Sequence, residues 1–127
     1  MRVAIDTNRY RDFCSNVPEV VLVLQKAERV YVPFVVLAEL RAGFGAGRHG
    51  KENERVLGLF LNRPRVALLF ADEETTFHFA RLYFQLRQQG TPVPVHDLWI
   101  AALTEQHRAV LCTRDAHFDR FPQIPRV

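Results

Sequence analysis

Short apolar runs recur along the chain and are separated by longer amphipathic segments. Four of these runs lack the polar alternation of a half-exposed strand, so they predict buried strands at residues 2–6, 29–33, 66–70 and 109–112. The segments between them predict a short helix or turn at 9–14 and helices at 18–28, 34–44, 53–62, 72–89 and 96–107. Strands that alternate with helices predict an α/β fold, a three-layer α/β/α sandwich around a mainly parallel sheet.

Two segments give less regular patterns. Glycines at 43, 45, 47 and 50, together with Arg48, His49 and Lys51, predict a mobile basic loop. The last residues, 124–127, form a candidate fifth strand, which Pro125 would confine to a sheet edge. We therefore expect four to five strands. The apolar side chains of segment 72–89 cover more than one face. Most of them are expected to belong to the core, and the excess could serve a dimer contact.

Composition sets the class of protein. The chain has 127 residues with 48% hydrophobic content, which predicts one domain over residues 1–127. No apolar run approaches the roughly 20 residues that span a bilayer, and the start does not resemble a signal peptide. Cys14 and Cys112 form no CxxC pair, which favours a reducing, cytoplasmic setting without membrane contact. The net charge of +3 mildly favours an anionic partner.

Four acidic residues occupy related places in this pattern. Asp6 ends the first strand, and Asp115 lies just beyond the fourth. Asp97 falls in the first turn of the helix that leads into the fourth strand, and Glu39 lies early in the helix after the second. Ligands bind at the carboxyl edge of open parallel sheets. The four carboxylates can meet there if strands one, two and four are neighbours.

Each acidic residue also has a simpler interpretation. Asp6 and Asp115 could be turn or helix-capping residues, and Asp97 could complement a helix dipole. Glu39 interrupts an apolar stretch, where a buried carboxylate would need a cation, although a surface position remains open. The histidines show no zinc spacing, and a lone surface histidine is the default for each, with His96 beside Asp97 as the exception. An oxygen-only cluster favours Mg²⁺, with Mn²⁺ as a substitute, over Zn²⁺.

Four motifs resemble those of PIN domains, and they occur in the family's order. They are Val-Ala-Ile-Asp-Thr-Asn at 3–8, Pro-Phe-Val-Val-Leu-Ala-Glu-Leu at 33–40, His-Asp-Leu-Trp-Ile-Ala-Ala at 96–102 and Leu-Cys-Thr-Arg-Asp-Ala-His-Phe at 111–118. The chain is most similar to VapC-type toxins, the ribonuclease half of toxin–antitoxin pairs. Two positions depart from the pattern: His96 stands where Asn is usual, and the segment 121–124 lacks a common glycine.

The resemblance implies a Mg²⁺-dependent endoribonuclease. Asp6, Glu39, Asp97 and Asp115 fall on the family's acidic positions, as catalytic residues and metal ligands, and Thr7 and Thr113 fall where a small hydroxyl residue is common. It also implies an RNA substrate and a cognate antitoxin, and the charge of the chain and its wide apolar helix at 72–89 add the expectation of a homodimer. Phosphates could be held by basic side chains, with solvated surface as the alternative: Arg9, Arg11, Arg48 and Lys51.

Two other functions stay open. The first is a non-catalytic PIN-like module that binds RNA or protein, which the intact acidic set disfavours. The second is a phosphatase that uses Asp6 as a nucleophile. The common aspartyl phosphatase pattern has a second Asp two residues later, and this chain has Asn8 there, so we give the second little weight.

Overall fold

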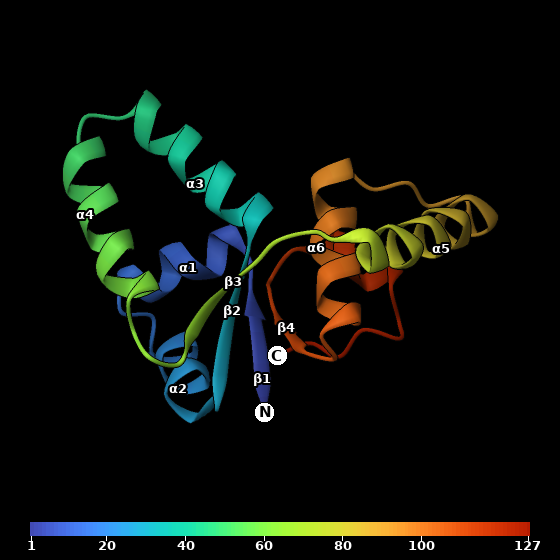
Figure 1. Cartoon of the computed structure of the whole chain (residues 1–127), viewed down its shortest axis with the longest axis horizontal. Coiled ribbons are helices and arrows are strands. Elements are labelled where there is room, and N and C mark those ends of the chain that lie inside the picture. Colours follow the sequence, from blue (N-terminus) through green and yellow to red (C-terminus); the bar gives the residue numbers. More distant parts are fainter.

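The sheet at the centre of the molecule has four parallel strands. The computed structural model describes all 127 residues, and its strands are β1 (Arg2–Ile5), β2 (Arg29–Pro33), β3 (Val66–Leu69) and β4 (Val110–Cys112). They lie in the order β3-β2-β1-β4, and every pair is parallel (Figure 1). Strand β1 therefore has β2 and β4 as its neighbours. This is the arrangement that the convergence of the four carboxylates requires.

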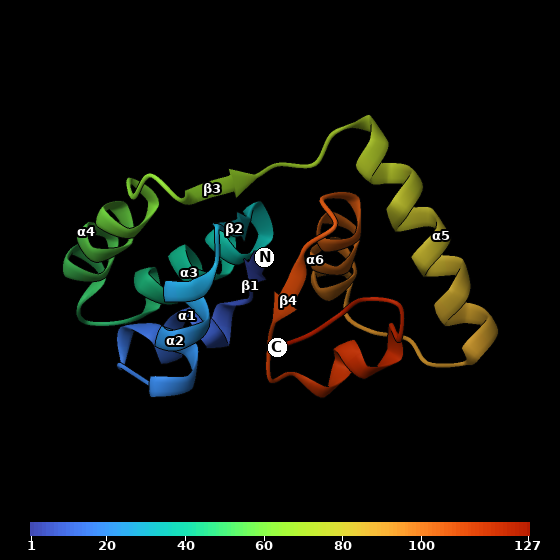
Figure 2. The same ribbon diagram turned by 90° about the horizontal axis from the view of Figure 1, so that it is seen from below.

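Six α-helices cover the two faces of this sheet, as the sequence predicted. Helices α1 to α4 lie on one side, and α5 and α6 on the other, in both views (Figures 1 and 2). None of the helices is long and apolar enough to cross a membrane. The helices are α1 (Thr7–Cys14), α2 (Pro18–Lys26), α3 (Phe34–Ala46), α4 (Gly50–Leu61), α5 (Glu73–Gln89) and α6 (Val95–Gln106), and a short 3₁₀ helix, η1 (Ala116–Arg120), follows β4.

The core explains why β1 lacks polar alternation, whereas the prediction of a buried strand at 66–70 is only partly right: β3 lies at the edge of the sheet, where Leu69 alone is buried and Phe70 is exposed. Helices pack on both faces of the sheet, so Val3, Ala4 and Ile5 of β1 are all completely buried. They belong to one cluster of 27 buried residues. The abrupt change from Ile5 to Asp6 therefore marks the place where the chain leaves this core at the carboxyl edge of β1.

The predicted basic loop over residues 43–51 is wrong. Helix α3 continues to Ala46 and α4 begins at Gly50, so only residues 47–49 connect them. A glycine inside a helix costs about 1 kcal/mol relative to alanine, a cost that packing can outweigh. Gly50 has a separate steric reason, since a Cβ there would lie 2.8 Å from the carbonyl oxygen of Phe44. The glycines at the connection mark a tight turn.

The predicted fifth strand is reduced to one bridge. Leu111 donates its backbone N–H to Pro125 and accepts one from Val127, at 2.8 and 3.0 Å, and a single parallel bridge joins Leu111 to Arg126. The C-terminal segment thus lies beside β4 but is too short to form a strand. It fixes the position of the loop that follows β4.

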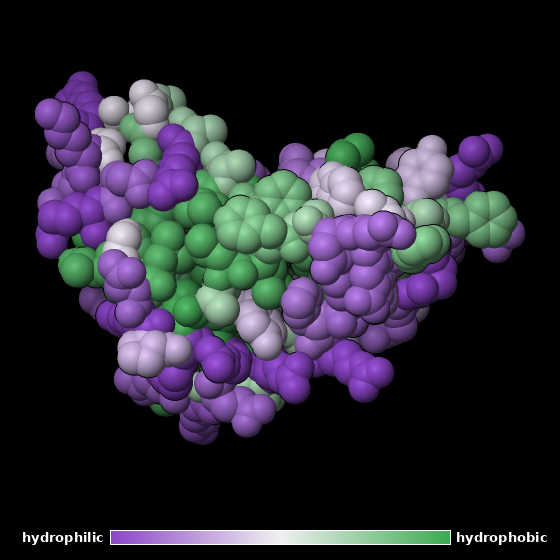
Figure 3. Space-filling view, viewed as in Figure 1, coloured by the Kyte–Doolittle hydropathy of each residue, from purple (hydrophilic) through white to green (hydrophobic).

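Aromatic side chains remain uncovered on two surfaces. Figure 3 shows an apolar area over the sheet, between α3 and α6. Phe34, at the start of α3, stacks on the exposed Phe70, just after β3, with ring centroids 6.5 Å apart. On α5, the rings of Phe77, Tyr83 and Phe84 are at least half exposed. The apolar excess predicted for this helix is therefore on the surface of the single chain.

Candidate active site

A cavity of about 140 Å³ lies where β1, β2 and β4 end. Its position follows from the topology, because parallel neighbours place their carboxyl ends at one edge. All four acidic residues singled out in the sequence border it. The lining residues are Asp6, Thr7, Asn8, Arg11, Glu39, His96, Asp97, Ile100 and Asp115.

Asp6 is the most deeply placed of the four, with 5% of its surface exposed. It caps α1: its Oδ1 accepts the backbone N–H of Arg9 at 3.0 Å. Its Oδ2 accepts the hydroxyl of Thr113. Burial raises the pKa of Asp6, although these hydrogen bonds oppose the rise. The capping role expected for Asp6 and a place in the acidic cavity therefore coexist in one residue.

Thr113 connects Asp6 to Asp115. Besides donating to Asp6, its hydroxyl oxygen accepts the backbone N–H of Asp115 at 3.0 Å. Asp115 in turn caps η1, because its Oδ1 accepts the backbone N–H of His117 at 2.9 Å. The turn after β4 is thus held by local hydrogen bonds that also orient the Asp115 carboxylate.

His117 is the site residue that the sequence did not indicate. Its Nδ1 lies 2.8 Å from Oδ2 of Asp97 and 3.4 Å from Oδ1 of Asp115. Donor atoms of these three residues lie within 4.8 Å of one another. The only available signal was its place two residues after Asp115. His96, which the sequence favoured, lies farther away, with its Nε2 3.8 Å from Oδ1 of Asp97.

Glu39 is half-buried, so its carboxylate is not sealed in the core. The hydroxyl of Thr7 donates to its Oε1 at 3.2 Å. No cationic side chain pairs with Glu39, and Arg41, two residues later, pairs with Glu54 at 2.9 Å. Glu39 therefore contributes a charge to the cavity that no protein cation neutralises.

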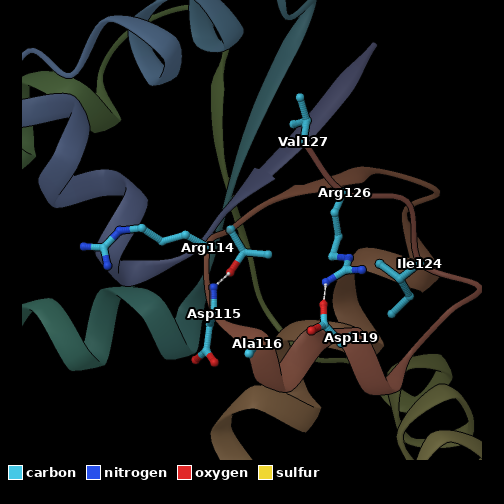
Figure 4. Close-up of a pocket in the computed structure, with 8 residues that line it drawn as sticks. Arg114, Asp115, Ala116, Asp119, Ile124, Arg126 and Val127 are labelled. Atoms are coloured by element: carbon cyan, nitrogen blue, oxygen red, sulfur yellow. Dashed lines mark hydrogen bonds and ion pairs between the residues drawn. The ribbon is translucent and has the colours of Figure 1, made fainter.

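Asp115 also borders a second, more open cavity of about 470 Å³. Figure 4 shows it between the loop after β4, η1 and the C-terminal segment. The two cations there are both paired: Arg114 with Asp12 at 2.9 Å, and Arg126 with Asp119. The charges of this cavity are therefore already balanced by neighbouring carboxylates.

The sequence matches a known family and several characterised relatives. A model of the PIN domain matches residues 13–124. Ribonuclease VapC1 of Haemophilus influenzae (strain R2866) is 28% identical over 125 residues, which cover 94% of this chain and 92% of the relative. Ribonuclease VapC5 of Mycobacterium tuberculosis (strain ATCC 25618 / H37Rv) is 31% identical over 91 residues, covering 72% and 67%.

Solved structures of VapBC proteins match the fold of this chain. The chain is similar to a chain in the structure of VapBC-1 from nontypeable Haemophilus influenzae, with a TM-score of 0.87, 26% identity and coverage of 100% of this chain and 97% of that chain. It is also similar to DNA-bound VapBC from Salmonella typhimurium, with a TM-score of 0.86, 25% identity and the same coverage. The whole length of this chain thus follows the fold of those proteins.

Proposed function

Because the chain belongs to the PIN domain family, we propose that it is a Mg²⁺-dependent endoribonuclease, the VapC-type toxin of a toxin–antitoxin pair. The observation that carries this proposal is the cavity bordered by Asp6, Glu39, Asp97 and Asp115. Its relatives include ribonucleases of the VapC group. We propose that these four residues form the catalytic site of a single nuclease domain over residues 1–127.

The donor set fits a hard divalent cation. The four carboxylates offer only oxygen atoms, which suits Mg²⁺ or Mn²⁺. Clustered carboxylates repel one another, and the elevated pKa of Asp6 includes a contribution from Asp115, after the larger one from burial. A cation held by Asp6, Glu39, Asp97 and Asp115 would relieve this repulsion. When bound, it would supply Lewis-acid stabilisation of a phosphodiester and an activated water.

The protein's own contribution is to hold the carboxylates in place. Thr113 fixes Asp6, Thr7 fixes Glu39, and His117 lies between the other two acids. Side chains that are already oriented lose little freedom when cation and substrate arrive. Hydrolysis of a phosphodiester needs such positioning together with charge stabilisation.

The proposed partners are an RNA substrate, an antitoxin and a second copy of the chain. Proteins of similar fold were solved as VapBC toxin–antitoxin complexes, which supports an antitoxin partner. The exposed rings of Phe77, Tyr83 and Phe84 on α5 support a homodimer. Both cysteines are free, which suits a cytoplasmic protein. Sizing of the pure protein at tens of micromolar should give a dimer, and a strict monomer would contradict that part of the proposal.

The alternative is a non-catalytic PIN-like module that binds RNA or protein. Such a module would not need four carboxylates around one cavity, because their mutual repulsion destabilises the fold when no cation is bound. The two functions also differ in whether they depend on a divalent cation. A nuclease needs a divalent cation for turnover, whereas a binding module has no turnover to lose when the cation is removed.

The decisive experiment follows cleavage of RNA and binding of Mn²⁺ in the same preparations. The wild-type protein should cleave in Mg²⁺ or Mn²⁺, stop in EDTA and bind Mn²⁺ in calorimetry. Asp97→Asn should lose both properties. Glu28→Gln is a matched control, since Glu28 is an exposed acid outside the cavity and should leave both unchanged. Full cleavage by Asp97→Asn, or cleavage in EDTA, would refute the metal-dependent mechanism.

A further inference from the structure

Most cations near the acidic cavity are already paired. Arg9 contacts Asp12 at 3.1 Å and Glu19 at 3.6 Å. Arg114 contacts the same Asp12 at 2.9 Å, so one carboxylate joins α1 to the loop after β4. These guanidinium groups form ion pairs within the protein that stabilise its fold. Binding a phosphate with either of them would mean breaking an ion pair.

Arg11 differs from both of these arginines. It borders the acidic cavity and is exposed. It makes no ion pair with a carboxylate and donates no side-chain hydrogen bond, in contrast to Arg9 and Arg114. It is therefore the one cation on the cavity wall whose guanidinium is available to an incoming anion.

A glycine on α3 makes room for this side chain. A Cβ on Gly43 would lie 3.1 Å from Nη2 of Arg11, closer than most side chains tolerate. The guanidinium of an α1 residue thus extends across the surface of α3. Glycine in the body of a helix is unfavourable by about 1 kcal/mol relative to alanine, and the position of Arg11 gives a reason for it here.

Arg11 also borders a third cavity, of about 490 Å³, between α1, α3 and α4. Its other walls include Tyr10, Phe44 and Asn53. Arg11 is the residue shared by this cavity and the acidic one. In the cavity on the other side of Asp115, Arg126 pairs with Asp119 (Figure 4) and Arg114 pairs with Asp12. An extended anionic chain therefore meets a free positive charge on the α1–α3 side only.

We infer that Arg11 binds the phosphate next to the scissile one and so positions the RNA strand at the acidic cavity. The RNA strand would leave the acidic cavity over Gly43, toward the cavity between α1, α3 and α4. The inference rests on the proposed ribonuclease function. A guanidinium offers paired N–H donors to phosphate oxygens, and its charge offsets the repulsion between the strand and the carboxylates.

The test measures binding of a labelled single-stranded RNA of about 12 nucleotides to an Asp97→Asn protein, which should not cleave it, over a range of NaCl concentrations. Arg11→Gln should weaken binding about tenfold, because it removes a hydrogen bond to a charged group. It should also reduce the slope of log K against log salt by about 0.7, the value for one phosphate contact on a single strand. Arg11→Lys should recover the slope, because it retains the charge.

Arg29→Gln is the matched control. Arg29 is also exposed, but it begins β2 at the opposite edge of the sheet, so its loss should leave affinity and slope unchanged. An Arg11→Gln protein with the parent slope would overturn the inference. An equal loss of RNA affinity in Arg11→Gln and Arg29→Gln would also overturn it, because Arg11 would then act only through the net charge of the protein.

Turnover of the otherwise wild-type protein separates this inference from the proposed function. Arg11→Gln should raise KM about tenfold and leave kcat nearly unchanged, because a flanking phosphate is bound equally in ground and transition states. A fall in kcat at unchanged KM would overturn the positioning role. Absence of cleavage by the wild-type protein would instead refute the ribonuclease proposal, and the salt slope would still decide the role of Arg11.

Discussion

The hydroxyl of Thr113 donates a hydrogen bond to Oδ2 of Asp6, a residue 107 positions earlier in the chain. Parallel pairing makes this contact possible, since β1 and β4 are neighbours and Ile5 lies opposite Cys112 in the register. The other carboxylate oxygen of Asp6 accepts the N–H of Arg9. Both oxygens of a buried acid are thus fixed by the protein, which leads to a first prediction.

Asp6→Asn should abolish RNA cleavage and leave the fold intact. Burial raises the pKa of Asp6, so the ionised form is disfavoured in the folded state and reduces stability at neutral pH. Asparagine has no charge and is also a good helix cap. The melting temperature in EDTA should therefore be equal to that of the wild type or higher. Cleavage and thermal melting should be measured on the same sample.

Asp72→Asn is the control for this substitution. Asp72 also caps a helix, α5, but it lies outside the acidic cavity. We expect it to retain cleavage, so loss of a capping aspartate would not by itself explain an inactive Asp6→Asn protein. Full activity of a folded Asp6→Asn variant would remove Asp6 from the catalytic site.

Glu39→Gln should weaken Mn²⁺ binding and lower turnover steeply without loss of stability. Glu39 has no cationic partner in the protein, so the substitution breaks no ion pair, and Gln can still accept the hydroxyl of Thr7. Calorimetric titration of Mn²⁺ and a melting curve measure the two effects. Glu54→Gln is the control, because it removes an exposed acid that pairs with Arg41 and should leave Mn²⁺ affinity unchanged.

The opposite pattern would assign Glu39 a structural role. If Glu39→Gln melted at a lower temperature and bound Mn²⁺ as the wild type does, its carboxylate would be stabilising the fold instead of holding a cation. Unchanged affinity, stability and cleavage together would leave a site of three carboxylates.

His117→Phe should reduce Mn²⁺ affinity by about 10- to 100-fold, the usual effect of removing a side chain that orients metal ligands. The Nδ1 of His117 lies 2.8 Å from Asp97, a direct hydrogen bond that holds that carboxylate toward Asp115. Phenylalanine keeps an aromatic side chain but has no ring nitrogen that could form this hydrogen bond. His49→Phe, at an exposed position before α4, should bind Mn²⁺ normally, and equal affinity in both variants would contradict an orienting role for His117.

The carboxyl edge of the sheet could be predicted because its signals are local. Each strand is an apolar run, Asp6 follows β1 directly, and Asp115 lies three residues after the end of β4. The alternation of strands and helices then requires a parallel sheet. The order of the strands, with β1 between β2 and β4, could not be predicted from these local signals.

The role of His117 could not be predicted in the same way. Its contact with Asp97 joins residues 20 positions apart, and it depends on how η1 packs against α6. The helices around Gly43 and Gly50 were missed for a related reason. Glycine content predicts a loop from local preference, whereas the contacts that a Cβ would make, with the backbone of Phe44 at Gly50 and with Arg11 at Gly43, depend on the tertiary structure.

Gly43→Ala should stabilise the protein, and the gain should depend on Arg11. Alanine favours a helix by up to about 1 kcal/mol over glycine. In the wild-type background the new methyl group would lie 3.1 Å from Nη2 of Arg11. Moving that side chain costs free energy, so the increase in the free energy of unfolding should be smaller. In an Arg11→Gln background the full gain should appear. Denaturant unfolding of the four proteins gives the coupling, and equal gains in both backgrounds would show that the two residues do not interact.

The last prediction concerns acid stability and Asp12. Its hydrogen bond from Arg114, with a further one from Arg9, lowers the pKa of Asp12 below the ordinary value of 3.8. A carboxylate whose pKa is lowered by folding stabilises the protein at pH values above its ordinary pKa. This contribution disappears as the pH falls through the lowered pKa. Asp12→Asn should therefore melt at a lower temperature than the wild type near neutral pH.

The difference between the two melting curves should shrink in acid. The contribution of Asp12 begins to shrink near pH 4, the ordinary pKa of an aspartate, and it is lost once the pH has fallen through the lowered pKa of Asp12. There the wild-type carboxylate is protonated and has lost its ion pairs with Arg9 and Arg114, as the variant has already done. Melting temperatures should be recorded from pH 7 downward in EDTA, so that metal binding at the nearby cavity does not contribute. A difference that stays constant through this range would show that Asp12 acts through packing or neutral hydrogen bonds. A difference that grows in acid would contradict a lowered pKa.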